Sequence, residues 1–162
     1  MILRKAIEND LPAIRDIYND AILNSTAVYE YEIFSDAYIL NWFKEKTDNN
    51  LPILIAESDN NVAGFATYGT FRHRAAYQYS AEHSLYVHSD FRQKGIGGQL
   101  LSAIIEEAKR NQIHTLIGGI DASNTVSLKM HAAFGFEQVG LIKEAAFKFD
   151  RWLDLVFMQK IL

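Results

Sequence analysis

The sequence predicts an α/β fold in which a mixed, mostly antiparallel central sheet carries helices on both faces. Three observations lead to this prediction. Apolar residues recur at helical spacing in four segments, and β-rich runs bounded by turn residues lie between those segments. The resulting order of elements is βααβββαβαββ, in which antiparallel strands precede two β-α-β crossovers.

Each helical segment has a recognisable start or end. Pro12 lies in the first turn of the first helix, where its missing N–H costs little, and Ser35 can cap the second. Gly135 ends the last helix. The expected helices are residues 11–24, 36–46, an amphipathic segment from Ile96 to Ala108, and 124–134.

The runs between the helices predict the strands. Asp59-Asn60-Asn61 is a tight-turn sequence, so the runs on either side of it are expected to form a hairpin. The segments 25–33 and 71–77 are rich in polar or basic and aromatic residues and are expected to be irregular. The expected strands are residues 1–7, 52–57, 62–68, 79–87, 115–120, 136–142 and 152–158.

The composition fits a single domain spanning residues 1–162. The chain is 49% hydrophobic and 22% charged, which suits a globular core, and its net charge of −4 gives no general footprint for nucleic acid. The absence of cysteine excludes disulfides, thiolate metal sites and a cysteine nucleophile, and the histidines have no metal-binding spacing. Without a long apolar run or a signal-peptide pattern, we expect a cytoplasmic protein that does not enter a membrane.

Residues 92–98 form a basic, glycine-rich turn between an apolar strand and a long helix. Free N–H groups and the dipole at a helix start favour an anion, and glycines let the backbone approach a diphosphate closely. Arg92 and Lys94 add positive charge. An ordinary turn with a solvated basic rim is the alternative. The spacing matches neither a nucleotide P-loop nor a dinucleotide-binding motif.

This turn and the helix near residue 124 together resemble the GNAT N-acetyltransferase superfamily. The superfamily pattern Q/R-x-x-G-x-G/A is met by Arg92, Gly95 and Gly97. Its second pattern, N-x-x-A/S-x-x-x-(Y)-x-x-x-G-F, is met by Asn124, Ser127, His131, Gly135 and Phe136.

The C-terminal half is most similar to the phosphinothricin-type branch of that superfamily, whereas the N-terminal half matches loosely. Residues shared with the branch are Arg74, Ala76, Tyr77, Ala81, Glu82, Tyr86, Val87, Ser127, Lys129, Met130, His131, Gly140, Phe147, Lys148, Trp152, Asp154, Phe157 and Gln159. The resemblance implies a GNAT fold and an N-acetyltransferase that uses acetyl-CoA.

The resemblance also implies where the cofactor binds. The diphosphate would lie on main-chain N–H groups near Gly95, the pantetheine arm would pair with the strand at Tyr86 and Val87, and an N–H near Val87 or His88 would polarise the thioester carbonyl. Asn124 would hold a pantetheine amide or cap its helix. The expected cofactor-binding residues are Tyr86, Val87, Arg92, Gln93, Lys94, Gly95, Ile96, Gly97, Gly98, Asn124 and Ser127.

Two residues are candidates for proton transfer. Glu82 occupies the position that the branch uses for a base, and a carboxylate with a raised pKa could deprotonate the acceptor amine. The alternative is a glutamate in a salt bridge. His131 stands where many superfamily members have a tyrosine that protonates the departing thiolate. It could act as that acid, or it could be a hydrogen-bonded histidine beneath the sheet.

The acceptor side is predicted from a basic and aromatic cluster. Cationic forks beside phenols suit a carboxylate or phosphinate, so the resemblance implies a small amino-acid-like amine such as phosphinothricin, methionine sulfoximine or methionine sulfone. Glu30 stands where some members carry an arginine, which disfavours phosphinothricin itself. The expected substrate-binding residues are Arg72, Arg74, Tyr77, Tyr79, Lys148 and Trp152, the last two near a homodimer interface.

Two other functions remain open from the sequence. One is an acetyltransferase for another amine, such as an aminoglycoside, a polyamine or a protein N-terminus. The other is a non-catalytic module that binds acetyl-CoA. Direct transfer through a ternary complex is expected for an enzyme, because the chain has neither cysteine nor a G-x-S-x-G nucleophile elbow.

Overall fold

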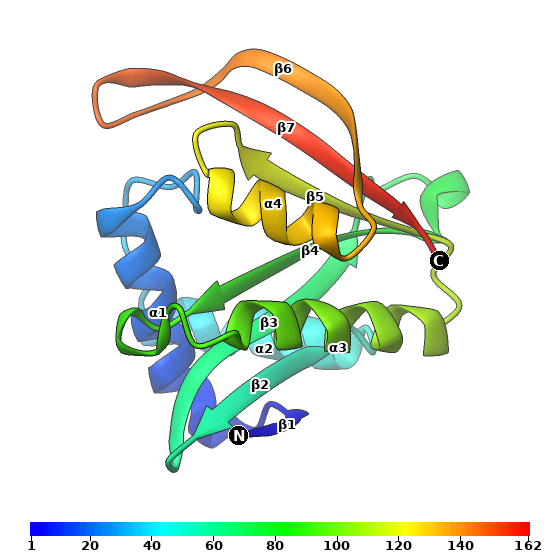
Figure 1. Cartoon of the computed structure of the whole chain (residues 1–162). Coiled ribbons are helices and arrows are strands. Elements are labelled where there is room, and N and C mark those ends of the chain that lie inside the picture. The colour runs from blue at the N-terminus through cyan, green and yellow to red at the C-terminus, as the bar shows by residue number, and fades with distance from the viewer.

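The computed structural model describes residues 1–162, and all strands join one seven-stranded sheet (Figure 1). The strand order is β1-β2-β3-β4-β5-β7-β6. Only β4 and β5 run parallel, and every other neighbouring pair is antiparallel, which confirms the predicted mixed sheet. The strands are β1 (Ile2–Lys5), β2 (Ile53–Ser58), β3 (Asn61–Thr70), β4 (Ser80–Val87), β5 (Thr115–Asp121), β6 (Glu137–Lys148) and β7 (Arg151–Ile161).

Four helices cover the two faces of the sheet, as predicted. α1 and α2 lie on one face, and α3 and α4 lie on the other (Figure 1). None of them combines the length and the apolar character that crossing a membrane requires. The helices are α1 (Leu11–Asn24), α2 (Asp36–Asp48), α3 (Ile96–Arg110) and α4 (Thr125–Ala133).

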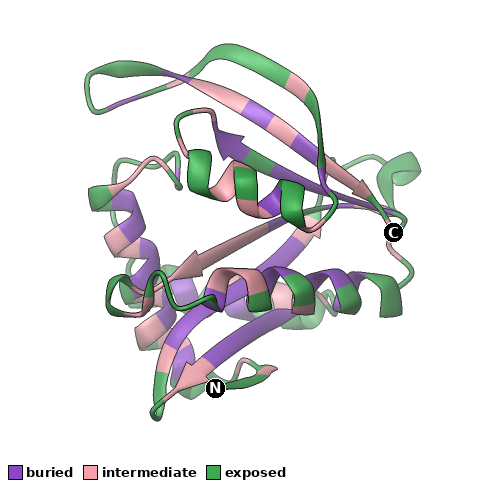
Figure 2. Ribbon diagram, viewed as in Figure 1, coloured by how far each residue is buried: buried purple, intermediate pink, exposed green.

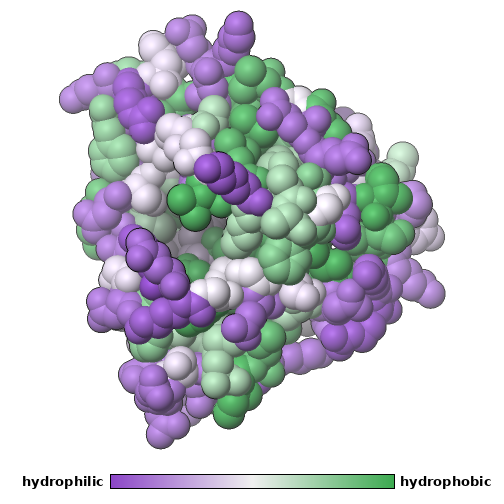
Figure 3. Space-filling model, in the orientation of Figure 1, coloured by the Kyte–Doolittle hydropathy of each residue, from purple (hydrophilic) through white to green (hydrophobic).

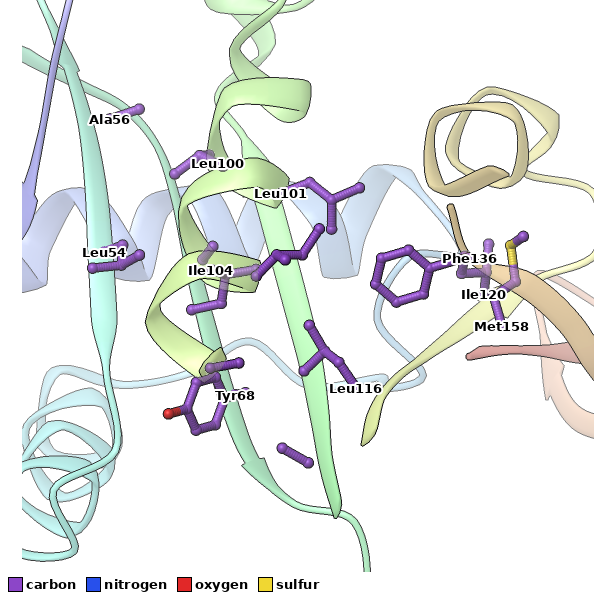
Figure 4. Close-up of a cluster of buried hydrophobic side chains, with 14 of the residues drawn as sticks. Leu54, Ala56, Tyr68, Leu100, Leu101, Ile104, Leu116, Ile120, Phe136 and Met158 are labelled. Atoms are coloured by element: carbon purple, nitrogen blue, oxygen red, sulfur yellow. The ribbon is translucent and has the colours of Figure 1, made fainter. Parts of the chain in front are cut away.

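Alternation along the central strands produces one hydrophobic core on each face. In β2, Ile53 and Ile55 pack with α1 and α2, whereas Leu54 and Ala56 pack with α3. Figure 4 shows Leu54 and Ala56 facing Leu100 of α3. The buried residues accordingly lie along the central strands and the sheet-facing sides of the helices (Figure 2).

The second crossover takes a longer path than the order of elements suggests. α4 joins β5 to β6, but β7 lies between those strands and pairs antiparallel with both. A two-residue turn at Phe149 and Asp150, with φ angles of 53° and 56°, folds β7 back along β6. Both strands are longer than predicted, because pairing with β7 keeps β6 extended through a bulge between Ile142 and Ala146.

The parallel strands β4 and β5 separate along their length. Their pairing covers only Ser80 to His83 against Thr115 to Gly118, although β4 stays paired with β3 as far as Val87. The β5-facing edge of β4 beyond His83 therefore has no strand partner. This separation lies next to the glycine-rich turn that precedes α3.

Candidate active site

A cleft of about 940 Å³ lies where β4 and β5 separate. Figure 3 shows a hollow on this face of the molecule with hydrophilic residues around its mouth. The end of β4, the starts of α3 and α4, the loop after α1 and the tip of the β6–β7 hairpin form its walls. All the predicted cofactor-binding residues except Lys94 line it: Tyr86, Val87, Arg92, Gln93, Gly95, Ile96, Gly97, Gly98, Asn124 and Ser127.

The glycines of the turn have different roles. Gly95 precedes the first turn of α3 with φ 77°, and no atom lies within 4 Å of where its Cβ would be. Its backbone is thus left-handed and open to a ligand, as the phosphate-binding interpretation requires. A Cβ on Gly97 would lie 3.2 Å from the sulfur of Met130, and one on Gly98 would lie 3.4 Å from the ring of Phe134. These two glycines allow α3 to pack closely against α4.

The two basic side chains of the turn are tethered at the rim of the cleft. The Arg92 guanidinium forms a 2.9 Å ion pair with Asp20 of α1 and also donates to the Val87 carbonyl at 3.4 Å. Lys94 donates to the Asp90 carbonyl at 2.9 Å and lies over the Phe91 ring. Both cations therefore remain beside the open start of α3.

Asn124 is a helix cap in this structure. Its side-chain oxygen accepts from the Ser127 N–H at 3.1 Å, so it satisfies one of the free donors at the start of α4. Both residues also line the cleft.

The Glu82 carboxylate lies on the face of β4 that also carries Tyr86. Burial raises its pKa above the ordinary value, and the nearby Arg72 guanidinium opposes that shift. The residue still remains accessible to solvent. No ion pair to Glu82 is formed, so the salt-bridge alternative receives no support from the geometry.

His131 forms a buried pair with His83 on the opposite face. Their Nε2 atoms are 2.9 Å apart and their rings are stacked. The His131 Nδ1–H donates to the Ser127 carbonyl at 2.8 Å, so its Nε2 accepts from the His83 Nε2–H. Burial lowers the pKa of both rings, to about 3 for His83, whose Nδ1 has no partner. Both rings are therefore neutral, and both His131 nitrogens are engaged.

The predicted acceptor residues do not all come together. Arg72 lies 5.3 Å from the centre of the Phe71 ring and close enough to Glu82 to affect its pKa, and Tyr77 packs edge-on against Phe71. Arg74 and Tyr79 are exposed, and the structure gives their side chains no hydrogen-bond partner.

Lys148 and Trp152 lie on the β6–β7 hairpin, away from this cluster. The buried Lys148 ammonium donates to the carbonyls of Ser25 and Val28 at 2.9 and 2.7 Å. Lys148 therefore fastens the hairpin to the loop after α1. Trp152 is 59% exposed and packs edge-on against Phe147.

Comparison with known proteins identifies the family. A domain-family profile described as "Acetyltransferase (GNAT) domain" matches residues 3–157. The chain belongs to the GNAT acetyltransferase family. It is therefore an N-acetyltransferase that uses acetyl-CoA, and the predicted family, fold and cofactor are confirmed.

Similar GNAT proteins differ in the acceptor that their names give. The chain is 40% identical over 158 residues to an L-methionine sulfoximine/L-methionine sulfone acetyltransferase of Pseudomonas aeruginosa, covering 97% of this chain and 92% of that enzyme. A Sinorhizobium meliloti phosphinothricin acetyltransferase in complex with acetyl-CoA has 37% identity and a TM-score of 0.97, with 99% and 88% of the two chains covered. A ribosomal-protein-alanine N-acetyltransferase of Brucella melitensis has 42% identity and a TM-score of 0.99 over the whole of both chains.

The unpaired edge of β4 suits the amide groups of acetyl-CoA. His88 donates its N–H to the Ala63 carbonyl of β3 at 2.9 Å, so this residue pair is a hydrogen-bonded one. Going back along β4 from His88, every second residue is hydrogen-bonded to β3, and the residues between have their main-chain groups on the other side of the strand. By this alternation, the main-chain groups of Leu85 and Val87 point toward the separated side of the strand. The Val87 N–H is thus directed toward the cleft, whereas the His88 N–H is already engaged.

Sequence reasoning missed several residues of the GNAT cleft. Ser25, Thr26 and Ala27 belong to a segment predicted only as a loop, Phe149 lies in the hairpin turn, and Arg151 follows that turn. Their place at the cleft depends on contacts between distant segments, which include the bond from Thr26 to Asp121. Gly118 and Gly119 line a smaller pocket next to this cleft and had a signal in the sequence, because glycine inside a strand often marks a close approach.

Proposed function

We propose that this enzyme transfers the acetyl group of acetyl-CoA to the α-amine of a small amino acid. The observation that carries the proposal is the proximity of Glu82 to Arg72, because one carboxylate that resists ionisation and one guanidinium suit the two charged groups of an amino acid. The names of relatives such as the methionine sulfoximine/sulfone acetyltransferase support this acceptor class. Residues 1–162 act as one catalytic domain.

The proposed reaction is direct transfer in a ternary complex. Glu82 accepts a proton from the acceptor's ammonium, and the free amine attacks the thioester carbonyl of the donor substrate acetyl-CoA. The C–S bond then breaks, and CoA leaves as a thiolate that takes up the proton lost by the new amide nitrogen. The Val87 N–H donates to the oxyanion that develops on this carbonyl. Arg92, Lys94 and the main-chain N–H groups from Gly95 to Gly98 hold the diphosphate.

For His131, we propose the structural alternative that the sequence left open. A neutral ring with both nitrogens hydrogen-bonded is poorly placed to give a proton to a thiolate. The pair with His83 instead fixes the position of α4 beneath the separated strands. Asn124 and Ser127, on the same helix, are thereby held at the cleft.

The remaining acceptor residues form an outer group in this proposal. Arg74, Tyr77 and Tyr79 lie on or next to the exposed segment after β3 and add charge and aromatic surface near Arg72. Glu30 contributes negative charge near Lys148 and raises its pKa, against the effect of burial. Because Glu30 stands where some family members carry an arginine, we expect a neutral sulfone or sulfoximine to be preferred over an anionic phosphinate.

We further propose a cytoplasmic homodimer, since acetyl-CoA is available in the cytoplasm and the edge strand β6 is apolar. Val139, Leu141 and Ile142 are exposed along β6, and Phe147 and Trp152 continue this surface onto the hairpin. An apolar edge strand that a second copy covers would not be open to aggregation. Light scattering of the purified protein measures the mass of the particle directly.

The decisive test measures thiol release from acetyl-CoA with a panel of acceptors. We expect turnover with methionine sulfone and methionine sulfoximine, and less with phosphinothricin. A peptide that begins with alanine tests the second candidate, which the similarity to the ribosomal-protein-alanine acetyltransferase favours. Turnover of the peptide alone would replace the amino-acid proposal. Binding of CoA in calorimetry without turnover of any of these amines would contradict both acceptor classes and favour the non-catalytic alternative.

A further inference from the structure

Two adjacent glycines interrupt the apolar strand β5 and lie on opposite faces of the sheet. A Cβ on Gly118 would meet His83 at 3.0 Å and His131 at 3.5 Å. A Cβ on Gly119 would meet the Glu82 Oε1 at 3.1 Å, the Leu155 side chain at 3.4 Å and Phe157 at 3.8 Å. Gly118 is buried, whereas Gly119 is exposed. The space above Gly119 is therefore open and bordered by the base of the proposed reaction.

This space has an apolar side. Phe157 is the cross-strand partner of Gly119 in β7, and Leu155 lies two residues before it on the same face. The ring of Phe157 packs edge-on against the ring of Phe71, with 6.2 Å between the ring centres. The Arg72 guanidinium in turn lies over the Phe71 ring. A carboxylate, a guanidinium and an apolar wall thus surround one glycine.

We propose that Gly119 determines which acceptors the enzyme accepts. The missing side chain leaves room for the acceptor's side chain to pack against Leu155 and Phe157, while its amine faces Glu82 and its carboxylate faces Arg72. The inference rests on the proposed function and specifies which acceptors the enzyme prefers. Amino acids with an unbranched, largely apolar side chain are preferred over those with a charged or β-branched one.

The first test substitutes Gly119→Ala and compares kcat/KM for methionine sulfone with that for 2-aminobutyrate, an acceptor with a much shorter side chain. We expect the ratio of the two kcat/KM values to fall about 10-fold or more, because one added methyl in a tight site discriminates on this scale. The affinity for CoA in calorimetry should be unchanged, since Gly119 does not line the cofactor cleft.

Gly140→Ala is the matched control. It adds the same methyl in a strand and also faces Phe157, but at 3.9 Å, which is an ordinary contact distance. Its ratio of kcat/KM values should match the wild type. A second variant, Phe157→Leu, enlarges the same space and should raise the relative kcat/KM for ethionine sulfone, which is one methylene longer than methionine sulfone.

The outcomes separate the inference from the proposed function. If the wild type acetylates amino acids but Gly119→Ala and Phe157→Leu leave the kcat/KM ratios unchanged, the role of Gly119 is wrong and the proposed function stands. If Gly119→Ala does not fold, Phe157→Leu alone decides, and an unchanged preference again overturns the inference. If the wild type acetylates no free amino acid, both fail, and the wild-type assay shows this without any variant.

Discussion

Glu82 and His83 are neighbours in β4, yet they lie on opposite faces of the sheet and differ in their exposure to solvent. The side chain of Glu82 remains accessible, beside Gly119 and Arg72. That of His83 is sealed between β5 and α4, with its ring stacked on His131. Burial favours the neutral form of each group, so it raises the pKa of the carboxyl and lowers that of the imidazole.

The same physical cause therefore has two consequences. On the open face, a carboxylate with a raised pKa is a better proton acceptor, and its exposure suits the proposed role of Glu82 as the base. On the other face, the imidazole pair is neutral and buried, and its nitrogens are used to hydrogen-bond one ring to the other and to α4. Adjacent residues can thus serve chemistry and packing, because a strand directs successive side chains to opposite faces.

Replacing Glu82 should have the largest effect. Glu82→Gln removes the proton acceptor and is expected to lower kcat/KM by about 10²–10⁴-fold. In the wild type, kcat/KM should rise with pH through a pKa above 4.5, because the carboxyl must first lose its proton. The variant should keep only the titration of the acceptor amine. Measuring kcat/KM upward from about pH 4.5, the ordinary pKa of a glutamate, tests this.

Glu137→Gln is the matched control for that experiment, because Glu137 is an exposed glutamate on the edge strand β6. It should behave like the wild type. Near-normal activity of Glu82→Gln across the pH range would show that Glu82 is not the base. The two faces of the sheet would then differ in burial but not in a role in the reaction.

Replacing His131 should affect stability more than turnover. His131→Ala leaves the buried His83 N–H without an acceptor and opens a cavity, so we expect a loss of about 2–5 kcal/mol in the free energy of unfolding. The folded variant should retain kcat within about tenfold, a bound set by the range of general acid catalysis. Urea unfolding and steady-state kinetics at low temperature measure the two quantities.

The exposed histidine of the loop before β5 provides the control. His114→Ala should change the unfolding free energy by less than about 0.5 kcal/mol. A drop of more than about 10²-fold in kcat for His131→Ala, with the fold intact, would favour the acid that protonates the thiolate.

The smallest expected effect is the change in the free energy of unfolding for each pH unit. His83 has a pKa of about 3 in the folded protein against 6.5 for an ordinary histidine, so only the unfolded chain takes up its proton in that interval. The unfolding free energy should therefore fall by about 1.4 kcal/mol for each pH unit below pH 6.5, with a further loss in the same direction from His131. Urea titrations between pH 7 and 5, about the range in which an ordinary histidine gains its proton, test this. Unchanged stability would mean that the pair is already charged when folded.

Much of the fold and of the candidate cleft could be predicted because their signals are local. Helical periodicity gave all four helices, and the turn around Gly95 could be recognised from neighbouring residues alone. The acceptor side was harder to predict. Lys148 is the clearest case, because its chemistry suggested an anion, whereas the fold surrounds its ammonium with two backbone carbonyls from the loop after α1.

By itself, the sequence determined the family, the order of elements and the glycine-rich turn before α3, since each depends on residues that are close along the chain. Only the tertiary structure decided that β7 lies between β5 and β6, that His131 finds His83, and that Gly119 opens a space beside Glu82. These features arise from contacts between strands and helices far apart in the chain. Their geometry is set by the packing of the whole sheet, which no local pattern encodes.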